Sequence, residues 1–141
     1  MKTVLITGSS RGIGAAIARR LNDKYKIVIN YNNSKKKAFE LLYELRKTNP
    51  NVIAIKADVS KEDEVNMMFD VAEKNFSNVD ILINNAGISH FSLIQDIEFD
   101  IWKDVINTNL NSVFLSSKRA IPNMISKGEG VIINMSSIWG D

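Results

Sequence analysis

The sequence contains no cysteine, a single histidine and two prolines among its 141 residues. The absence of cysteine excludes disulfides and thiolate metal sites, and it fits a reducing compartment. No apolar run approaches the length that spans a membrane, and the chain enters its first predicted strand without a hydrophobic leader or a small-residue cleavage site. We therefore expect a soluble, cytoplasmic protein with no metal site and no membrane partner.

Neither sign of charge is in excess, because 18 basic residues are set against 16 acidic ones. Proteins that bind nucleic acid through charge carry a basic excess, so we expect no nucleic-acid partner. The length suits one core, and no linker or low-complexity tract divides it. We expect a single domain over residues 1–141.

The stretch Thr3–Gly14 reads T-V-L-I-T-G-S-S-R-G-I-G, an apolar strand that runs into a glycine-rich turn. A helix is predicted from Gly12 onward, with its inward face formed by Ile13, Ala16, Ile17 and Leu21. Glycines let the chain turn tightly and let phosphate approach the free N–H groups of a helix start. The predicted phosphate-binding residues here are Gly8, Ser9, Ser10, Arg11, Gly12, Ile13 and Gly14. A strand-turn-helix unit without a ligand is the alternative, and the spacing is not that of a P-loop.

Strands then alternate with helices along the chain. Further strands are predicted at Lys26–Tyr31, Val52–Lys56, Val79–Ile83 and Val131–Met135. This alternation predicts an α/β fold with a doubly wound parallel sheet (Rossmann), which we expect in the strand order 3-2-1-4-5. Ligands in such sheets lie at the carboxyl ends of the strands.

The helices between these strands have predicted inward faces. Ala38, Leu41, Leu42 and Leu45 share a face of the second, and Ser60 opens the third with Asp63 in the capping-box position. A long helical stretch after about Glu98 has an inward stripe, interrupted by Asn109, and a kink or break near residues 118 to 122, where Pro122 lies. The stripe comprises Trp102, Ile106, Leu110, Val113, Phe114, Ile121 and Ile125.

Polar and small residues follow each predicted strand. The loop after the second strand, Tyr31–Ser34, has no acidic residue to bind the ribose 2′-OH of NAD. Together with Arg11 and the lysines at 35 to 37, this favours NADP, with Asn32 as a contact. The alternative is that Arg11 packs over the turn and the lysines face water.

The third and fourth strands add Asp58-Val59 and Asn84-Asn85-Ala86-Gly87 to the same edge of the sheet. Asp58 could accept a hydrogen bond from the adenine amino group or cap the following turn. Asn85, Ala86 and Gly87 are expected cofactor contacts, and the two amides can also bind neighbouring strand ends. His90 is expected to be a solvated loop residue without a catalytic role.

The patterns T-G-x-x-x-G-x-G, N-N-A-G and N-x-S-S-I-x-G resemble those of the short-chain dehydrogenase/reductase family over essentially the whole chain. The resemblance implies an oxidoreductase that uses NADP (NADPH), with Ser137 hydrogen-bonding the substrate carbonyl and the Asn109 carbonyl holding a water of the proton relay. The N-Y-x-x-S after the second strand is closest to the 3-oxoacyl-acyl-carrier-protein reductases. The implied substrate is a small-molecule or acyl-carrier-bound ketone, and a homo-oligomer is implied.

The family also uses a Tyr-x-x-x-Lys about thirteen residues beyond the serine, and this sequence contains none after Ser137. We expect a chain that is truncated relative to the family, lacks its C-terminal strands and helices, is catalytically incomplete alone, and self-associates through the fifth strand and the long helix. The alternatives are a non-catalytic dinucleotide-binding or assembly module and a short-chain alcohol or sugar dehydrogenase. A flavodoxin-like module is disfavoured, because the first strand has no acidic residue at its carboxyl end.

Overall fold

A computed structural model describes residues 1–140, so Asp141, the end of the predicted domain, lies outside the described residues. Five strands form one parallel sheet in the order β3-β2-β1-β4-β5. This confirms the doubly wound fold and its strand order. The strands are β1 (Thr3–Ile6), β2 (Lys26–Tyr31), β3 (Val52–Lys56), β4 (Ile81–Asn84) and β5 (Val131–Asn134).

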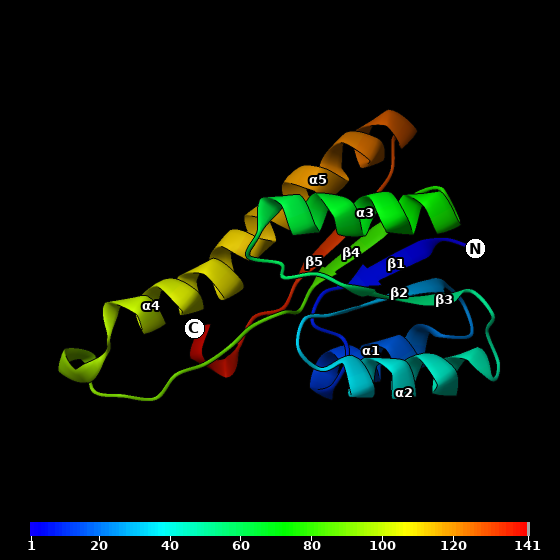
Figure 1. The fold of residues 1–141 in the computed structure, drawn as a ribbon. Coiled ribbons are helices and arrows are strands. Elements are labelled where there is room, and N and C mark those ends of the chain that lie inside the picture. Colours follow the sequence, from blue (N-terminus) through cyan, green and yellow to red (C-terminus); the bar gives the residue numbers. More distant parts are fainter. Residues whose placement is uncertain (141) are drawn as a thin grey trace.

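Helices cover both faces of the sheet. Figure 1 shows α1 (Gly12–Leu21) and α2 (Lys35–Arg46) on one face and α3 (Glu62–Phe76) and α5 (Ser112–Lys127) on the other. Because strand side chains alternate, Val4 and Ile6 belong to the core under α1 and α2, while Leu5 belongs to the core under α3 and α5. The strands β1, β2 and β4 are largely buried on both faces, as is typical of a parallel sheet, whereas the edge strand β5 is largely exposed, with Val131 at 49% and Ile133 at 44%.

The inward face of α2 is as predicted, whereas that of α1 is as predicted only in part, since Ile17 and Leu21 pack against the core. Ala38, Leu41, Leu42 and Leu45 are buried. In α1 the buried residues are Gly14, Ala15 and Ala18, whereas Ile13 and Ala16 are exposed. Small residues let α1 lie close to the sheet.

The predicted capping box at the start of α3, formed by Ser60 and Asp63, is not present in the structure. Ser60 does not cap the helix, and Asp63 is exposed. Instead, the Asp58 Oδ1 atom accepts hydrogen bonds from the Ser60 N–H (3.0 Å) and hydroxyl (2.6 Å), and Glu64 Oε1 accepts the Asp58 N–H at 3.0 Å. The turn before α3 is therefore closed by Asp58 and Glu64.

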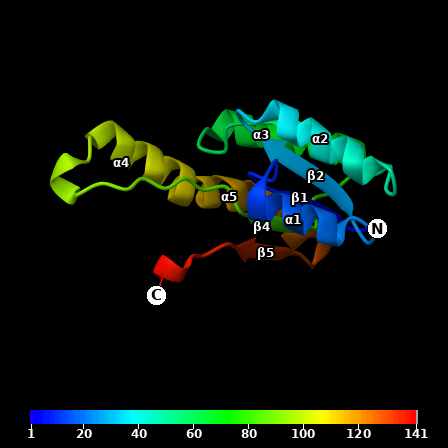
Figure 2. The ribbon, with the colours of Figure 1, turned by 90° about the horizontal axis from the view of Figure 1, so that it is seen from below.

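The predicted inward stripe of the long helix is wrong for most of its members. Trp102, Leu110, Phe114, Ile121 and Ile125 are exposed. The buried residues of α5 are instead Ser112, Ser116, Ala120 and Met124, whose mostly small side chains allow close packing on α3 and β4. The helix α4 (Phe99–Ile106) extends beyond the sheet (Figures 1 and 2), and none of its residues is buried.

The irregular turn of this helical stretch is also not where Pro122 predicts it. The helix α5 continues through Pro122 without a break and ends at Gly128, which has a left-handed φ of 73°. A π-helical turn instead joins α4 to α5 at Asn107–Asn111. Such turns are frequent at functional sites, which directs attention to Asn109.

Arg119 fixes α5 on α3. Its guanidinium lies over the Phe69 ring, 5.3 Å from the centroid, and contacts Glu73 Oε2 at 2.6 Å and Asp70 Oδ1 at 2.9 Å. The Glu73 hydrogen bonds, with a smaller effect from Asp70, raise the pKa of Arg119 despite the opposing effect of burial. This planar, multiply bonded contact sets the position of the helix that carries the π-helical turn.

No helix within residues 1–140 is long and apolar enough to cross a membrane.

Asp80 joins three elements at the amino ends of the strands, opposite the glycine turn. Its carboxylate accepts the Thr3 N–H at 2.8 Å and a hydrogen bond from Lys127. Burial alone would raise the pKa of Asp80, but the Lys127 and Thr3 hydrogen bonds, with the charges of Lys127 and Lys2, outweigh it and hold the pKa below its usual value. The ionised carboxylate therefore stabilises the fold.

We predict that Asp80→Asn destabilises the protein by about 1–3 kcal/mol near neutral pH, because Lys127 and the Thr3 N–H lose a charged acceptor. A pKa that is lowered on folding contributes stability above the unfolded value, and this stability is lost as the pH falls below about 4. Urea unfolding should therefore show a flatter pH dependence in the variant below about pH 4 than in the wild type. Asp63→Asn, at an exposed position of α3, is the matched control; equal pH profiles for the wild type and Asp80→Asn would contradict the prediction.

Candidate functional site

Two adjoining cavities lie at the carboxyl ends of the strands. The first has a volume of about 610 Å³ and extends from the glycine turn to the ends of β2 and β3. The second, of about 430 Å³, reaches the residues after β5. Both are lined by Ile13 and by Asn85, Ala86 and Gly87, so together they form one cleft along this edge of the sheet.

The glycine turn brings backbone to the wall of the first cavity at positions where side chains do not fit. Gly8 has a φ of +61°, and a Cβ there would lie 2.9 Å from Ala86 Cα. Gly14 lies behind the turn, where a Cβ would be 2.6 Å from Asn85 Nδ2 and 2.8 Å from Ser9 Cα. Gly8 thus shapes the cavity, while Gly14 lets α1 pack against the strand ends.

The start of α1 offers unsatisfied donors to this cavity. No side chain among residues 1–140 caps the helix, so the N–H groups of its first turn have no partner within it. Gly12 and Ile13, in that first turn, line the first cavity. A helix start with free N–H groups and a positive dipole end can bind an anion such as a phosphate.

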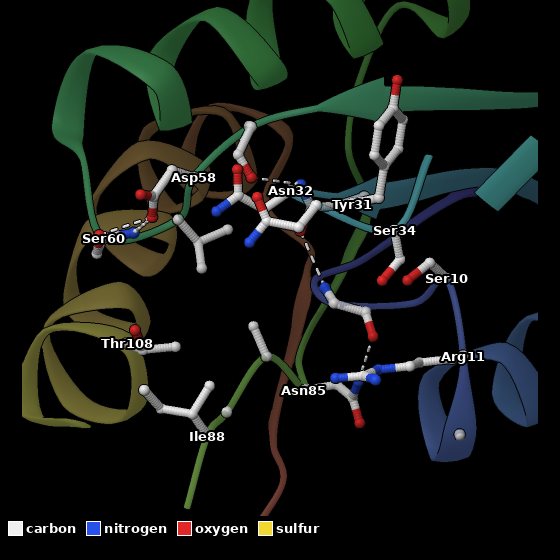
Figure 3. A pocket seen from close by; sticks show the side chains of 18 of the residues that line it. Ser10, Arg11, Tyr31, Asn32, Ser34, Asp58, Ser60, Asn85, Ile88 and Thr108 are labelled. Atoms are coloured by element: carbon white, nitrogen blue, oxygen red, sulfur yellow. Dashed lines mark hydrogen bonds between the residues drawn. The ribbon is translucent and has the colours of Figure 1, made fainter. Parts of the chain in front are cut away.

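The predicted residues of the turn divide into two groups. Ser10, Arg11 and Asn32 line the first cavity, and Figure 3 shows Ser10 and Arg11 on the opposite side from Asp58 and Ser60. Ser9 does not line it: its side chain is fully buried, donates to the Ile6 carbonyl at 2.7 Å and accepts the Asn30 N–H at 3.1 Å. Ser9 supports the turn from behind.

Two side chains that hold the strand ends were not singled out from the sequence. Asn30 Oδ1 accepts the Gly8 N–H at 2.9 Å, and its Nδ2 donates to the Ala57 carbonyl at 3.1 Å. Thr7 Oγ1 accepts the N–H groups of Asn85 and Ala86, both at 3.0 Å. A polar residue in the apolar run K-I-V-I-N-Y is the signal for Asn30, because a buried amide must be hydrogen-bonded.

The two amides after β4 bind neighbouring strand ends, as predicted. Asn84 Nδ2 donates to Asn134 Oδ1 at 2.9 Å and to Ser117 Oγ at 3.3 Å, which joins β4 to β5 and α5. Asn85 Nδ2 donates to the carbonyls of Thr7 (3.0 Å) and Gly8 (3.1 Å). Both amides therefore fix the floor of the cleft, and Asn85 also lines it.

Asp58 and Val59 lie at the far end of the first cavity, beyond Asn32. The prediction that Asp58 caps the turn is confirmed by its bonds to Ser60. A carboxylate has two oxygens, so this role leaves Oδ2 able to accept a bond from a ligand.

Asn109 bonds a different segment, not its own helix. Its Oδ1 accepts the Ile88 N–H at 2.8 Å and its Nδ2 donates to the Ile88 carbonyl at 2.7 Å. A polar residue in an apolar helical stripe can also be a buried amide that bonds its own helix, and the bonds to Ile88 rule this out for Asn109. In the π-helical turn the Ser112 N–H donates to the Asn107 carbonyl. The Ser112 hydroxyl donates to the Thr108 carbonyl. Asn109 thus pins the loop after β4 to an irregular turn beside the second cavity.

Ser137 lies in the second cavity together with Asn109, as predicted. Its Oγ accepts the Trp139 N–H at 3.2 Å, so the hydroxyl hydrogen is free to be donated to a carbonyl oxygen. His90 lines neither cavity and is exposed. Among residues 1–140, no tyrosine lines the second cavity; Tyr31 lines the first.

We predict that Gly14→Ala lowers stability by several kcal/mol, because backbone and a hydrogen-bonded amide occupy the Cβ position. Gly87→Ala is the matched control, since its Cβ would meet nothing closer than Asn109 Oδ1 at 3.4 Å. Urea unfolding of both variants checks this, and equal midpoints would contradict the packing role of Gly14.

Comparisons with known proteins agree with this geometry. The family model of short chain dehydrogenases matches residues 2–141. The 3-oxoacyl-[acyl-carrier-protein] reductase FabG of Staphylococcus aureus is 40% identical over 140 residues, which are 99% of this chain and 57% of that protein. The 3beta-hydroxysteroid dehydrogenase 1 of Eggerthella lenta is 41% identical over 139 residues, 97% of this chain and 53% of that one.

Among solved structures, a gluconate 5-dehydrogenase from Burkholderia cenocepacia, in complex with NADP and tartrate, is similar with a TM-score of 0.87 and 36% identity. The match covers 96% of this chain and 53% of that one, so the chain spans little more than half the length of each of these three relatives. The chain belongs to the short-chain dehydrogenase family of oxidoreductases.

Proposed function

We propose that these residues bind NADPH along the two adjoining cavities and form the cofactor-binding part of a carbonyl reductase. The observation that carries the proposal is the single cleft from the free N–H groups of α1 to the Ser137 hydroxyl. The residues fit the cofactor, because Gly12 lines the first cavity with a φ of +58° and has nothing within 4 Å of the position of a Cβ, so a pyrophosphate can approach the backbone there. When bound, the cofactor supplies a hydride to the carbonyl carbon.

The first cavity favours NADP over NAD. The guanidinium of Arg11 can pair with a 2′-phosphate, and the amide of Asn32 brings no negative charge to the same wall. The loop Tyr31–Ser34 has no carboxylate that would bind a 2′-OH and repel a phosphate. The related gluconate 5-dehydrogenase was solved with NADP, which supports this choice. In the proposed complex Asp58 and Val59 contact the adenine.

The second cavity is proposed to hold the carbonyl of the substrate. Ser137 donates its hydroxyl hydrogen to the carbonyl oxygen, where negative charge develops during reduction. Asn109 holds the loop after β4, and its turn positions a carbonyl for a water of the proton relay. The similarity to FabG makes a 3-oxoacyl thioester the proposed substrate, and the gluconate dehydrogenase makes a polyhydroxylated ketone the alternative.

A second candidate is a dinucleotide-binding or assembly module without catalysis. It is favoured by the lining of the second cavity, where no tyrosine of residues 1–140 is placed to donate a proton to the nascent alkoxide. The 141-residue polypeptide is therefore proposed to bind NADPH with little or no turnover alone. Loss of NADPH fluorescence on adding a 3-oxoacyl thioester would show turnover, whereas saturable binding with stable fluorescence supports the second candidate.

We further propose that the chain self-associates through the outer face of α5. Phe114 and Ile125 are 63% and 74% exposed there, and Trp102 continues the apolar surface on α4. Exposed apolar patches of this kind mark interaction sites.

For cofactor choice, we predict that Arg11→Ala weakens NADPH binding about ten- to a hundredfold, because a charge-assisted bond to the 2′-phosphate is lost. NADH has no 2′-phosphate, so its affinity should change little. Arg20→Ala, exposed on the same helix and outside both cavities, is the matched control. Calorimetric titrations with both cofactors check the prediction, and an equal loss for NADPH and NADH would contradict it.

Asn32→Asp should reverse the preference. A carboxylate at the end of β2 would repel the 2′-phosphate and accept a hydrogen bond from the ribose 2′-OH. We expect NADPH binding to weaken and NADH binding to strengthen, each by about tenfold. The same titrations measure both constants, and an unchanged ratio would show that position 32 does not face the ribose.

For self-association, Phe114→Glu should shift the protein towards monomer in sedimentation equilibrium, because a charge would be buried in the proposed interface. Tyr43→Glu is the matched control, since Tyr43 is 62% exposed on α2, away from that face. A wild-type protein that stays monomeric at high concentration would refute the interface.

A further inference from the structure

The second cavity has few groups free to hydrogen-bond a substrate. None of its lining residues within 1–140 is charged. Both polar atoms of the Asn109 side chain are bonded to Ile88, and the Asn85 NH₂ group is bonded to two backbone carbonyls. The remaining side-chain groups are the Asn85 oxygen and the hydroxyls of Ser136 and Ser137. A substrate with many hydroxyl groups would therefore leave water for few hydrogen-bond partners here.

Apolar side chains occupy the rest of the lining. Trp139, Met135 and Ile13 line the second cavity and are 80%, 40% and 64% exposed. An exposed indole beside a cavity can bury a large apolar area against a ligand. Burial against these three side chains would stabilise a bound apolar group, because its surface leaves water. The same burial would be unfavourable for a polyhydroxylated group.

The backbone fixes Trp139 next to the reacting hydroxyl. The Trp139 N–H donates to Ser137 Oγ at 3.2 Å, and the Gly140 N–H donates to the Ser137 carbonyl at 2.9 Å. A Cβ at Gly140 would lie 2.6 Å from Ser136 Oγ, so this turn is folded closely on the serines. The side chain of Trp139 therefore starts one short turn from the place where a carbonyl would bind.

We propose that Trp139 is a specificity-determining residue, whose indole packs on an apolar chain or ring attached to the carbonyl carbon. The site then prefers ketones with a long apolar substituent, such as 3-oxoacyl thioesters, over polyhydroxylated ketones. The inference rests on the proposed function, because it takes Ser137 as the group that binds the carbonyl. It adds which residue of the cleft selects between the two substrate classes named there, and by which contact.

The test is calorimetric titration of the whole chain, with and without saturating NADP⁺, which has no hydride to transfer. The two probes are a 3-oxodecanoyl thioester of N-acetylcysteamine and 5-ketogluconate. We expect the wild type to bind the thioester at least about tenfold more tightly than 5-ketogluconate. Trp139→Ala should weaken thioester binding about tenfold, and Trp139→Phe, which keeps an apolar ring, should weaken it less.

Phe91→Ala is the matched control, because Phe91 is an exposed aromatic residue (88%) that lines neither cavity. It should leave thioester affinity unchanged. In Trp102→Phe the emission comes from Trp139 alone, and it should shift to the blue with the thioester and not with 5-ketogluconate.

The inference is overturned if Trp139→Ala binds the thioester as tightly as the wild type, if 5-ketogluconate binds at least as tightly, or if the thioester does not bind. A separate NADPH fluorescence titration of the same proteins, in the absence of NADP⁺, distinguishes failure of this inference from failure of the proposed function. If NADPH binds but the preference for the thioester over 5-ketogluconate does not depend on Trp139, only this inference is contradicted. If NADPH does not bind, the proposed function is contradicted. The titrations without cofactor still decide whether Trp139 selects the ligand.

Discussion

The cleft depends on a set of side-chain hydrogen bonds that lock the strand ends together around the glycine turn. Asn30 bonds Gly8 and Ala57, and Thr7 and Asn85 exchange bonds across β1 and β4. These bonds replace the ladder where the chain leaves the sheet, so the turn is held without side chains inside it. A backbone fixed in this way can present its free N–H groups to an anion at no further ordering cost.

This constraint also links the two halves of the cleft. The residues after β4 pack against Gly8 on one side and are tied to the π-helical turn through Asn109 and Ile88 on the other. The turn is continuous with α5, which Arg119 holds on α3. The position of the second cavity is therefore set by packing on the far side of the sheet as well as by the strand ends.

The sequence predicted the sheet well because its signals are local. Buried parallel strands read as continuous apolar runs, so β2 and β3 were placed at their observed residues, and β1, β4 and β5 within a few residues. The glycine spacing and the polar residues after each strand located the cleft for the same reason. Ser9 is predicted as a ligand contact although its side chain lies behind the turn. Spacing alone does not distinguish a side chain that faces the cavity from one that supports the turn from behind.

The helix faces were harder to predict. An apolar stripe on a helix predicts that the stripe is buried, but it does not tell whether the same chain or another molecule buries it. In α5, Phe114 and Ile125 face outward, whereas Ser116 is buried. The partner of Asn109 could not be read either, because Ile88 lies twenty-one positions away on a loop without a pattern. Such contacts follow from three-dimensional packing, which one-dimensional periodicity does not encode.

An NMR titration of the labelled chain with NADP⁺ tests whether the glycine turn binds the cofactor. We expect the largest amide shifts at Ser10 to Ile13, where the free N–H groups of α1 would bind the pyrophosphate, with further shifts at Asn32 and Gly87. Shifts that leave the glycine turn unperturbed, or that cluster on the outer face of α5, would contradict this expectation.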